Sequence, residues 1–399
     1  MKQGWISKKF TDVVWFQEGP GVRKHQYTSD GVKLLNVANL VNGEVDLSTS
    51  DRYISADEAY GKYKHFLVDE GDLILASSGI QVDYIEKKMG FIHKKHLPLC
   101  MNTSTIRFKA LNTSALNMIF FMYYLKSTDF KIQLSRLITG IAQLNFGPSH
   151  LKQMTIPVPP IEEQERIVEE LDCLSGVIEK KREQLRELDA LAQSIFYTMF
   201  GDPITNEKGW EVKKLGEVCE DKKKILRASK KCALDDAINY IDISAIDNIN
   251  NVITMPTPYI FEEAPSRAQQ VVQLGDVIVS MVRPNLKNIA IVNCDYDNLI
   301  ASSGFCVLRA RKEMTIPFLF YIVKSDAFTM YLMDRVSGAN YPAVRESDIT
   351  DYITIVPPIS LQQEFADKIE AIEKQKALIK QSITQTEELF NARMDYYFN

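Results

Sequence analysis

Two long stretches of the chain carry an apolar stripe with the period of a coiled-coil helix. In residues 161–200 and again in residues 359–399, apolar residues recur in alternating steps of four and three. Such steps fill the a and d positions of a heptad, which predicts two helices of roughly 40 residues, each with a coiled-coil seam. The positions assigned to the seams are Ile167, Leu171, Leu174, Ile178, Leu185 and Leu188 in the first helix, and Phe365, Ile369, Ile372, Ile379 and Ile383 in the second.

Local signals mark where these helices begin and end. Acidic residues follow Pro159-Pro160, where the positive end of a helix dipole favours them. Ser360 and Gln363 have the spacing of a capping box for the second helix. Gly201-Asp202-Pro203 is expected to end the first helix.

One lysine interrupts each seam, Lys181 in the first helix and Lys376 in the second. A polar residue at a seam position favours a fixed register between two paired helices. The alternative is that the helices are independent and that each lies on its own globular domain. A stripe of only two positions per heptad is narrower than most globular helices show, which favours pairing.

The rest of the chain is also repeated. Val158-Pro159-Pro160-Ile161 recurs 198 residues later as Val356-Pro357-Pro358-Ile359. The repeat unit is a globular domain followed by one long helix, so the predicted division is 1–160, 161–200, 201–358 and 359–399. Further pairs related by the same offset are Tyr123, Lys126, Ser127, Phe130 and Gly140 with Tyr321, Lys324, Ser325, Phe328 and Gly338.

The repeat continues across the two ends of the chain. Gly209-Trp210, after the first helix, matches Gly4-Trp5, and Phe398 matches Phe200. The termini are therefore expected to lie together. Two helices that each leave one domain and run to the other are then most simply packed antiparallel, with approximate two-fold symmetry.

Both globular halves are predicted to combine short strands with a closing helix. The predicted fold class is α+β, with two pseudo-symmetric mixed, strand-rich globular domains separated by two long helices that form an antiparallel coiled coil. Short helices are expected around 116–125 and 317–323. Apolar runs bounded by turn residues predict strands at 34–37, 72–75 and 105–108 in the first half, and at 240–243, 276–280 and 305–308 in the second.

Charge is distributed unevenly along the chain. The net charge is −5, yet residues 161–200 alone contribute −5 and residues 1–160 contribute +5. The first globular half is therefore basic, which suits a negatively charged partner such as nucleic acid. No apolar run has membrane-spanning length, and the N-terminal residues lack the apolar stretch of a signal peptide, which favours the cytoplasm and no membrane partner.

The motifs of an enzyme do not occur. There is no glycine-rich cofactor loop, no P-loop and no Asn/Asp-Pro-Pro-aromatic motif of a methyltransferase. Asp83 with Glu86-Lys87-Lys88 has the residue types of a metal-dependent nuclease, but a solvated surface is favoured because the second half has no equivalent. His93, His96 and Cys100 are too loosely spaced for a metal site, so solvated histidines are favoured. We expect no catalytic residue, metal or cofactor on this chain.

Several segments instead carry residues that are suited to binding nucleic acid. Six of the ten residues at 222–231 are basic, the density that phosphate neutralisation needs, although a solvated loop is the alternative. The segment 282–288 follows a strand directly and offers Arg, Asn and Lys, whose side chains hydrogen-bond base edges. Its counterpart in the first half is 77–81. A second pair of matched loops lies just upstream of the long helices, with one loop before each helix.

Loops at equivalent positions with different polar residues at their tips are expected of two domains that recognise different sequences. They are also expected of surface loops whose sequences have diverged by chance. The residues assigned to DNA binding are Arg23, Lys24, Ser77, Ser78, Gln81, Gln143 and Asn145 in the first half, and Lys222, Lys223, Lys224, Arg227, Arg283, Asn285, Lys287, Asn340, Tyr341 and Arg345 in the second.

These features together resemble the specificity subunit of type I restriction-modification systems, over essentially the whole chain. The similarity lies in Gly-Trp near each domain start, Gly71-Asp72 and Gly275-Asp276 before a strand, Pro-Pro-Ile with Glu/Gln-rich opening turns, and Phe200-Gly201-Asp202-Pro203 at the central joint. The resemblance implies two target recognition domains, each reading one half of a bipartite site on double-stranded DNA. It also implies that the helices set the unread gap and dock two modification (methyltransferase) subunits.

The resemblance further implies restriction (translocase) subunits, a role in DNA methylation and phage defence, and binding of the methyl donor and ATP by the partner subunits. Three alternatives stay open: the recognition subunit of a related bipartite restriction or phage-defence system, a structural tether with no nucleic-acid role, and a degenerate methyltransferase. Basic loops at equivalent domain positions favour DNA binding over the tether, and the missing cofactor motifs weigh against the methyltransferase.

Overall fold

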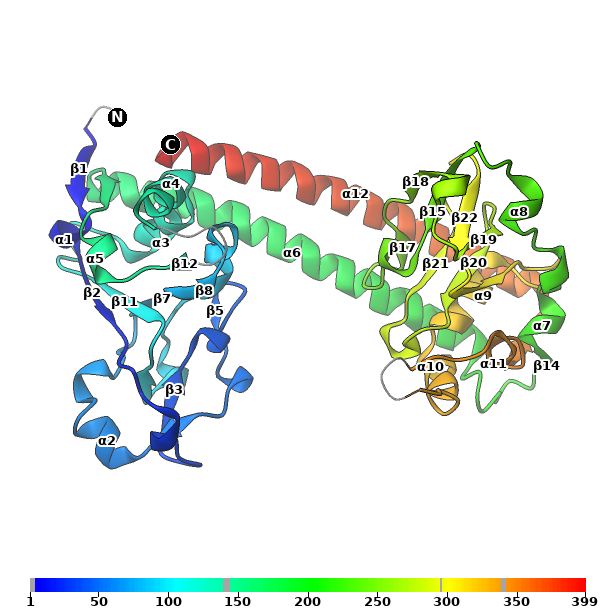
Figure 1. Ribbon diagram of the computed structural model, residues 1–399, viewed down its shortest axis with the longest axis horizontal. Coiled ribbons are helices and arrows are strands. Elements are labelled where there is room, and N and C mark those ends of the chain that lie inside the picture. The colour runs from blue at the N-terminus through cyan, green and yellow to red at the C-terminus, as the bar shows by residue number, and fades with distance from the viewer. Residues whose placement is uncertain (1–3, 139–143, 295, 339–341) are drawn as a thin grey trace. The chain divides into compact units, whose positions relative to one another are not determined.

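The computed structural model describes residues 4–138, 144–294, 296–338 and 342–399. It contains two compact units: unit 1 comprises Met1–Lys181 and Ser382–Asn399, and unit 2 comprises Arg182–Gln381. Each unit therefore holds one strand-rich globular body and a segment of each long helix (Figure 1). The α+β architecture with two such bodies and two long helices is confirmed, and the boundary between the units divides each helix near its middle.

Short helices surround the strands in both bodies, and two helices are far longer than the others. In chain order the α-helices are α1 Phe10–Val13, α2 Ala56–Tyr60, α3 Met118–Lys126, α4 Thr128–Leu137, α5 Pro148–Leu151, α6 Ile161–Phe200, α7 Leu215–Val218, α8 Ala228–Lys231, α9 Ile316–Lys324, α10 Asp326–Met333, α11 Glu346–Thr350 and α12 Ile359–Phe398.

The strands are short throughout. Those of unit 1 are β1 Ile6–Lys9, β2 Val14–Glu18, β3 Val32–Leu35, β4 Leu40–Val41, β5 Glu44–Val45, β6 Tyr53–Ile54, β7 Leu73–Ala76, β8 Ser78–Ile80, β9 Met89–Phe91, β10 Leu99–Met101, β11 Thr105–Ala110, β12 Leu144–Asn145 and β13 Thr155–Val158. Those of unit 2 are β14 Glu211–Lys214, β15 Ala237–Ile241, β16 Ile246–Asp247, β17 Val252–Ile253, β18 Thr257–Ile260, β19 Ala268–Val271, β20 Val277–Ser280, β21 Ile289–Ile291, β22 Leu299–Ser302, β23 Phe305–Leu308 and β24 Ile353–Val356.

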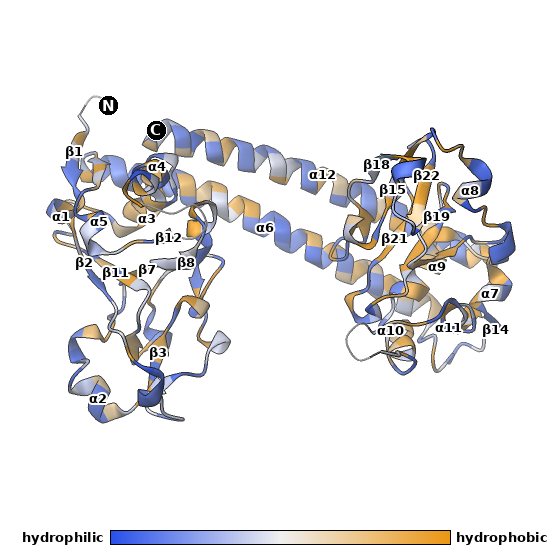
Figure 2. Ribbon diagram, viewed as in Figure 1, coloured by the Kyte–Doolittle hydropathy of each residue, from blue (hydrophilic) through white to orange (hydrophobic). Residues whose placement is uncertain are grey.

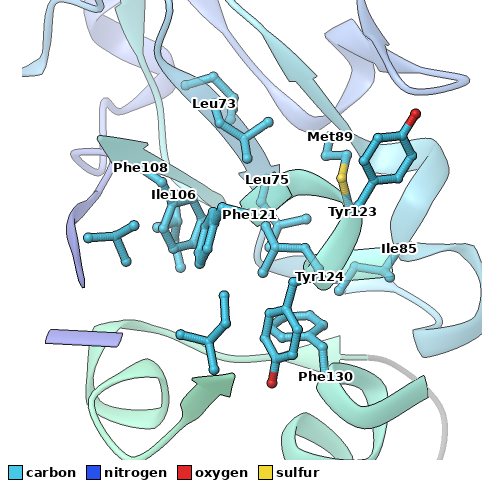
Figure 3. Close-up of a cluster of buried hydrophobic side chains, with 14 of the residues drawn as sticks. Leu73, Leu75, Ile85, Met89, Ile106, Phe108, Phe121, Tyr123, Tyr124 and Phe130 are labelled. Carbon is cyan, nitrogen blue, oxygen red and sulfur yellow. The ribbon is translucent and has the colours of Figure 1, made fainter. Parts of the chain in front are cut away.

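The core of unit 1 is built on a four-stranded antiparallel sheet in the order β2-β11-β7-β9. Every side chain of β7 is buried, as its continuous apolar run requires. The helix α3 covers this sheet, and its Phe121 ring lies 5.3 Å from that of Phe108, close to Leu75 (Figure 3). The sheet and α3 thus form one apolar core beneath the loop that follows β7.

Unit 2 repeats this plan around β20, which is likewise buried throughout and lies at the centre of the sheet β21-β20-β23. A second sheet, β18-β15-β22-β19, corresponds to the smaller sheet β10-β3-β6 of unit 1. The strand pairs that lead into the long helices even share one register, since Ile6 lies opposite Val158 and Glu211 lies opposite Val356. The repeat in the sequence is therefore a repeat of the fold.

Within each unit the segments of α6 and α12 run antiparallel. In unit 1, Glu170 contacts Arg393 and Lys181 contacts Ser382, so positions that rise along α6 meet positions that fall along α12. In unit 2 the Lys376 ammonium donates to Asp189 at 2.7 Å, and the same sense continues through aromatic contacts nearer the start of α12. Both seam lysines are therefore satisfied by the opposite helix.

Most predicted seam positions face the interior of a unit. Figure 2 shows apolar and polar residues distributed around both helices. The helix ends contribute to the cores of the globular bodies as well as to the contact between helices, so the helices pack both on the bodies and on each other. The buried positions are Ile167, Leu171, Ile178, Phe365, Ile369 and Ile372, and the half-buried ones are Leu174, Leu185, Leu188, Ile379 and Ile383.

The start of each long helix is anchored by a fully buried glutamine. The Gln362 side chain accepts a hydrogen bond from Thr315 N at 2.9 Å and donates to Glu313 O at 2.9 Å and Pro357 O at 2.8 Å. The predicted capping box of Ser360 is wrong, because α12 already begins at Ile359. The first helical hydrogen bonds lead back to Pro358, whose carbonyl accepts from Leu361 N at 2.9 Å and from Gln362 N at 3.1 Å, so Ser360 already lies inside the helix.

Gln164 does the same in unit 1. It accepts from Asn117 N at 2.8 Å and donates to Ala115 O and Pro159 O at 2.9 Å each. The two glutamines are 198 residues apart, so this anchor is part of the repeat.

The chain ends pack together in unit 1. The Phe120 ring lies 6.3 Å from Trp5 and 5.2 Å from Phe398. At the equivalent place in unit 2, the Trp210 indole donates to the Phe200 carbonyl at 2.8 Å. The continuation of the repeat across the two ends of the chain predicted that the termini lie together.

Among the described residues no single helix is long and apolar enough to cross a membrane, and only α9 and α10 taken together pass by length and composition, with a bend of 53° between them. All six cysteines are free thiols, of which Cys100, Cys219 and Cys306 are buried.

Candidate nucleic-acid interface

The loop predicted to recognise DNA leaves the central buried strand in both units, after an anchored turn. Gly71 and Gly275 have φ angles of 87° and 88°, a conformation that favours glycine. The aspartates that follow them are buried. Asp276 accepts two hydrogen bonds from the Arg309 guanidinium, at 2.7 and 2.8 Å. The Gly-Asp motif therefore fixes the start of the strand, and with it the origin of the loop.

In unit 1 this loop is paired with the segment that precedes α5. The strand β8 pairs antiparallel with β12, with Asn145 opposite Ser78. The Ser78 hydroxyl donates to Asn145 Oδ1 at 2.5 Å. Asn145 and Gln81 are exposed, whereas Ser77 is only 1% exposed. The structure thus brings Ser78 and Asn145 together on the surface and places Ser77 inside the domain.

Unit 2 pairs the equivalent segments. Val282 forms a β-bridge with Ala343, and Arg283 N donates to Pro342 O at 2.8 Å. The side chains of Arg283 and Asn285 are exposed. In both units, then, the loop after the central strand lies beside the segment that leads toward the long helix, as the two matched pairs of loops in the sequence suggested.

Lys287, which the sequence assigned to DNA binding, makes contacts within unit 2. Its ammonium donates to Asp326 Oδ1 at 2.6 Å and to Lys324 O at 3.2 Å. The side chain is therefore used to hold the turn against α10. Gln143, Asn340 and Tyr341 lie outside the described residues.

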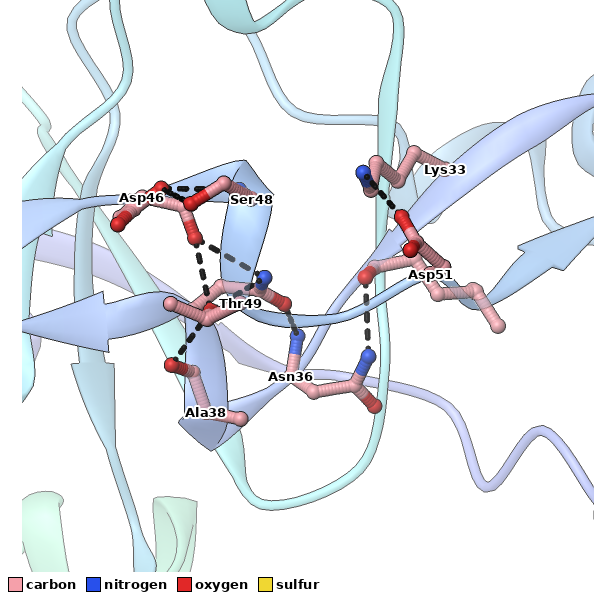
Figure 4. A network of polar contacts seen from close by, with 9 residues as sticks. Lys33, Asn36, Ala38, Asp46, Ser48, Thr49 and Asp51 are labelled. Carbon is pink, nitrogen blue, oxygen red and sulfur yellow. Dashed lines mark hydrogen bonds and ion pairs between the residues drawn. The ribbon is translucent and has the colours of Figure 1, made fainter. Parts of the chain in front are cut away.

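A short hairpin supports the loop in each unit. In unit 1 the hairpin of β4 and β5 is organised by polar contacts, among them Thr49 Oγ1 to Ala38 O at 2.8 Å and Ser48 N to Asp46 Oδ1 at 2.8 Å (Figure 4). Hydrogen bonds from Ser48 lower the pKa of Asp46. Lys88, in the segment after β8, donates to Leu40 O at 2.8 Å. The hairpin and the loop segment of unit 1 are therefore tied together.

The hairpin of β16 and β17 does this in unit 2 through two asparagines. Asn248 Nδ2 donates to Leu286 O at 2.9 Å, and Asn251 Nδ2 donates to Lys287 O at 3.1 Å. Sequence reasoning missed both residues. The available signal was the run Asp247-Asn248-Ile249-Asn250-Asn251, since clustered Asn and Asp indicate a tight turn.

The predicted lysine cluster lies on the surface of unit 2 but is not uniform. Lys222 forms an ion pair with Glu346 of α11, directly after Arg345, and Lys224 pairs with Glu220 at 2.7 Å. Arg345 is exposed at the start of α11. Lys222 is thereby close to the segment that pairs with the loop after β20.

The other predicted basic residues occupy separate places. Lys223 is exposed beside Lys222, and Arg227 is exposed where its backbone bridges to Gln270 of β19. In unit 1, Arg23 and Lys24 are exposed at a 3-10 turn, Lys24–Gln26. The residues on either side of that turn, Val22 and Tyr27, pack in a smaller apolar cluster that is distinct from the core around β7.

No described group of three His, Cys, Asp or Glu side chains could hold a metal ion. The expectation of a solvated His96 is wrong, because the side chain is buried and its Nδ1 accepts a hydrogen bond from His93 N at 3.1 Å. Glu86, from the nuclease-like triplet, pairs with Lys131 at 3.1 Å. These groups make structural contacts.

A hydrogen-bond network joins α6 to the end of α12 in unit 1. Glu170 accepts hydrogen bonds from Arg393 Nη2 at 2.9 Å and from the Tyr397 hydroxyl at 2.6 Å. The hydrogen bond from Arg393 is the main cause that lowers the pKa of Glu170. The equivalent positions in unit 2 are Lys368, Ile195 and Met199, so this network belongs to unit 1 alone.

We expect acid to weaken this contact. Because the folded-state pKa of Glu170 lies below its unfolded value of about 4.3, the network stabilises unit 1 above that pH. The contribution is lost as the pH falls through the folded-state pKa. Glu170→Gln should therefore reduce the loss of stability between neutral and strongly acidic pH, measured by urea unfolding. Glu169→Gln, at the exposed neighbouring position, is the control and should leave the pH dependence unchanged; equal behaviour of the two variants would contradict the assignment.

The structure defines a protein with two copies of one loop-bearing domain and two long helices, each of which contributes a segment to both units. The family model of the type I restriction modification DNA specificity domain matches residues 2–189 and 207–388. The chain belongs to this family and carries its domain twice.

The chain is also similar to individual type I specificity subunits. The type I restriction enzyme MjaVIII specificity subunit of Methanocaldococcus jannaschii is 25% identical over 193 residues, which cover 48% of this chain and less than half, 44%, of that protein. The MjaIX specificity subunit of the same organism is 22% identical over 393 residues, covering 92% of this chain and 86% of that protein. The crystal structure of a type I restriction-modification system S subunit from M. genitalium has the same fold, with a TM-score of 0.52 and 15% identity over 98% of this chain and 95% of that one.

Proposed function

We propose that this chain is the DNA-recognition subunit of a type I restriction-modification complex and that it reads a bipartite site on double-stranded DNA. Each unit recognises one half of the site through its paired loops. The observation that carries the proposal is the repetition of this pair: β8 with β12 in unit 1, and the Val282–Ala343 bridge in unit 2. One surface built twice, with different polar side chains, suits two different half-sites.

The segments of α6 and α12 set the unread gap and dock two modification (methyltransferase) subunits, and restriction (translocase) subunits join that core. Methyl donor and ATP bind to those partners, so the chain itself acts without a catalytic residue, metal or cofactor of its own. The proposed location is the cytoplasm, where the chain meets the DNA that its partner subunits modify. Support for the division of labour comes from the family to which the chain belongs.

Within unit 1, Ser78, Gln81 and Asn145 are the proposed base-reading residues, and Arg23 and Lys24 are proposed to meet the phosphate backbone away from the paired loops. In unit 2, Arg283, Asn285 and Arg345 are the proposed readers. The cluster formed by Lys222, Lys223, Lys224 and Arg227 is proposed to meet phosphates. Phosphate contacts fix position and orientation without carrying sequence information.

The second candidate function is a structural tether with no nucleic-acid role. The salt dependence of binding to duplex DNA distinguishes it from DNA recognition. Replacing Lys222, Lys223 and Lys224 by alanine should weaken binding to all duplex sequences alike. The slope of log affinity against log salt should fall by about 1 to 3, since each phosphate contact contributes about 0.9. Affinity is measured by titration of the purified chain into labelled duplex at several salt concentrations.

Lys368 and Lys374 provide a matched control, because they are surface lysines of α12 that also pair with acids. Their replacement by alanine should leave the slope unchanged. A change of preferred sequence with no change of slope would contradict the phosphate role of the cluster. Absence of any salt-dependent affinity in the parent protein would favour the tether.

A further inference from the structure

The turn Arg283–Lys287 in unit 2 is held in an unusual backbone conformation. The 3-10 turn Pro284–Leu286 is flanked on both sides by residues in the left-handed region: Arg283 has φ 50° and Lys287 has φ 49°. Residues other than glycine rarely adopt such angles, and surrounding contacts must hold them there. The turn is therefore defined by its neighbours.

Three sets of contacts fix its backbone. At its start, Arg283 N donates to Pro342 O at 2.8 Å. At its end, the Lys287 side chain is bound to Asp326 at 2.6 Å. In the middle, Pro284 is buried, so the turn is also pinned by packing. The outward-facing side chains, Arg283 and Asn285, stand on a scaffold with little freedom.

The hairpin of β16 and β17 supplies the remaining contacts, to the two carbonyls at the end of the turn. Asn248 donates to Leu286 O and Asn251 to Lys287 O. Asn251 is 6% exposed, and its own φ of 54° is one that asparagine tolerates better than most residues. Asp247 in turn accepts hydrogen bonds from Ile249 N at 2.9 Å and Asn250 N at 3.0 Å, which fixes the hairpin.

We propose that Asn251, assisted by Asn248, is a positioning residue that determines the sequence specificity of the second half-site. Its amide holds the Arg283–Lys287 turn in the one conformation from which Arg283 and Asn285 meet base edges. The inference rests on the proposed function. Fixed geometry matters here because bidentate contacts to a base tolerate little displacement, and a loosened turn would let one side chain meet several bases.

The test separates the amide of Asn251 from its backbone angle. Asn251→Gly keeps a residue that tolerates positive φ and removes the side-chain amide, including the donor to Lys287 O. Asn251→Asp keeps the shape and sets a carboxylate oxygen against the Lys287 carbonyl. Asn239→Ala is the matched control, since the Asn239 amide also donates to a backbone carbonyl of unit 2, that of Asp297 at 2.9 Å, away from the turn.

Each variant is expressed with its modification subunits in a host without other methylation, and methylated positions are mapped across the genome. We expect Asn251→Gly and Asn251→Asp to lose discrimination by roughly tenfold or more at bases of one half-site. The other half-site and the gap should be retained, and Asn239→Ala should give the parent motif. Thermal unfolding of the variants serves as the check on folding, because a purely structural loss would reduce methylation at every site alike without relaxing the motif.

The outcomes are distinct. A variant that stays folded and gives the parent motif would overturn the positioning role while leaving the proposed function intact. A parent protein whose genome map shows no bipartite motif would overturn the proposed function itself. If Asn251→Gly is too unstable to test, Asn248→Ala addresses the same turn from an exposed loop, and an unaltered motif there would count against the proposal.

Discussion

Replacing Gln362 by methionine is expected to destabilise unit 2 by roughly 3 kcal/mol or more, since buried polar groups left without partners cost about 1–3 kcal/mol each. Methionine keeps the length of the side chain but can neither accept from Thr315 N nor donate to Glu313 O and Pro357 O. Three backbone groups around the fully buried Gln362 would then lack their partners. For a unit of this size the melting temperature should fall by about 6–12 °C.

The measurement can be confined to one unit. The chain has three tryptophans, and only Trp210 belongs to unit 2. In a background with Trp5 and Trp15 replaced by phenylalanine, Trp210 fluorescence reports the urea unfolding of unit 2 alone. Gln363→Met is the matched control, because Gln363 is the exposed neighbour, and it should change the free energy of unfolding by less than about 0.5 kcal/mol.

The equivalent substitution in the other repeat extends the test. Gln164→Met should leave the Trp210 transition unchanged, because Gln164 lies in unit 1. Equal effects of Gln362→Met and Gln363→Met would show that the buried hydrogen bonds contribute little. The glutamine anchor would then be a consequence of the helix start and not its cause.

The long helices and the central strands could be predicted because their signals are local and repeated. A four-and-three stripe defines a helix wherever it packs, and the continuous apolar run of β7 or β20 identifies a strand that is buried on both faces. The offset of 198 residues then carried each assignment from one half to the other. The side chains that anchor these elements were less visible: Gln164 and Gln362 stand in Glu/Gln-rich turns where only the structure shows which glutamine points inward.

The candidate site could be predicted only in outline. The sequence indicated which loops to compare, and the structure brings them together in both units. It could not show that Ser77 is buried while Ser78 is at the surface, since a one-residue difference along a strand reverses the direction of the side chain. Nor could it show that Lys287 binds Asp326 or that Asn251 holds Lys287 O, because those contacts join residues 39 and 36 positions apart.

Lengthening the helices is expected to widen the unread gap of the DNA site without altering either half-site. Four residues inserted after Leu185 extend α6 by roughly 6 Å, at 1.5 Å per residue, which corresponds to about two base pairs at 3.4 Å each. Four residues also shift the a/d seam by a stutter, which a coiled coil accommodates by local unwinding. The globular bodies and their paired loops are untouched by the change.

The antiparallel contacts within the units show how to lengthen α12 to match. Lys181 meets Ser382, and Asp189 meets Lys376, so Leu185 corresponds to a position near Ile379. A double variant with the same four residues after Leu185 and after Leu378 keeps both helices equal in length and leaves these two polar contacts within their own units. It should show the widened gap with less loss of stability than the single insertion.

Genome-wide maps of methylation in cells that carry each variant with its modification subunits give both half-sites and the gap in one experiment. The same four residues inserted after Thr113, in the exposed turn between β11 and α3, form the control and should leave the gap unchanged. If the gap stays fixed in the helix variants while the recognised bases change, α6 and α12 do not set the spacing. A gap that grows by about two base pairs between two unchanged half-sites would establish that the length of these helices sets the spacing between the half-sites.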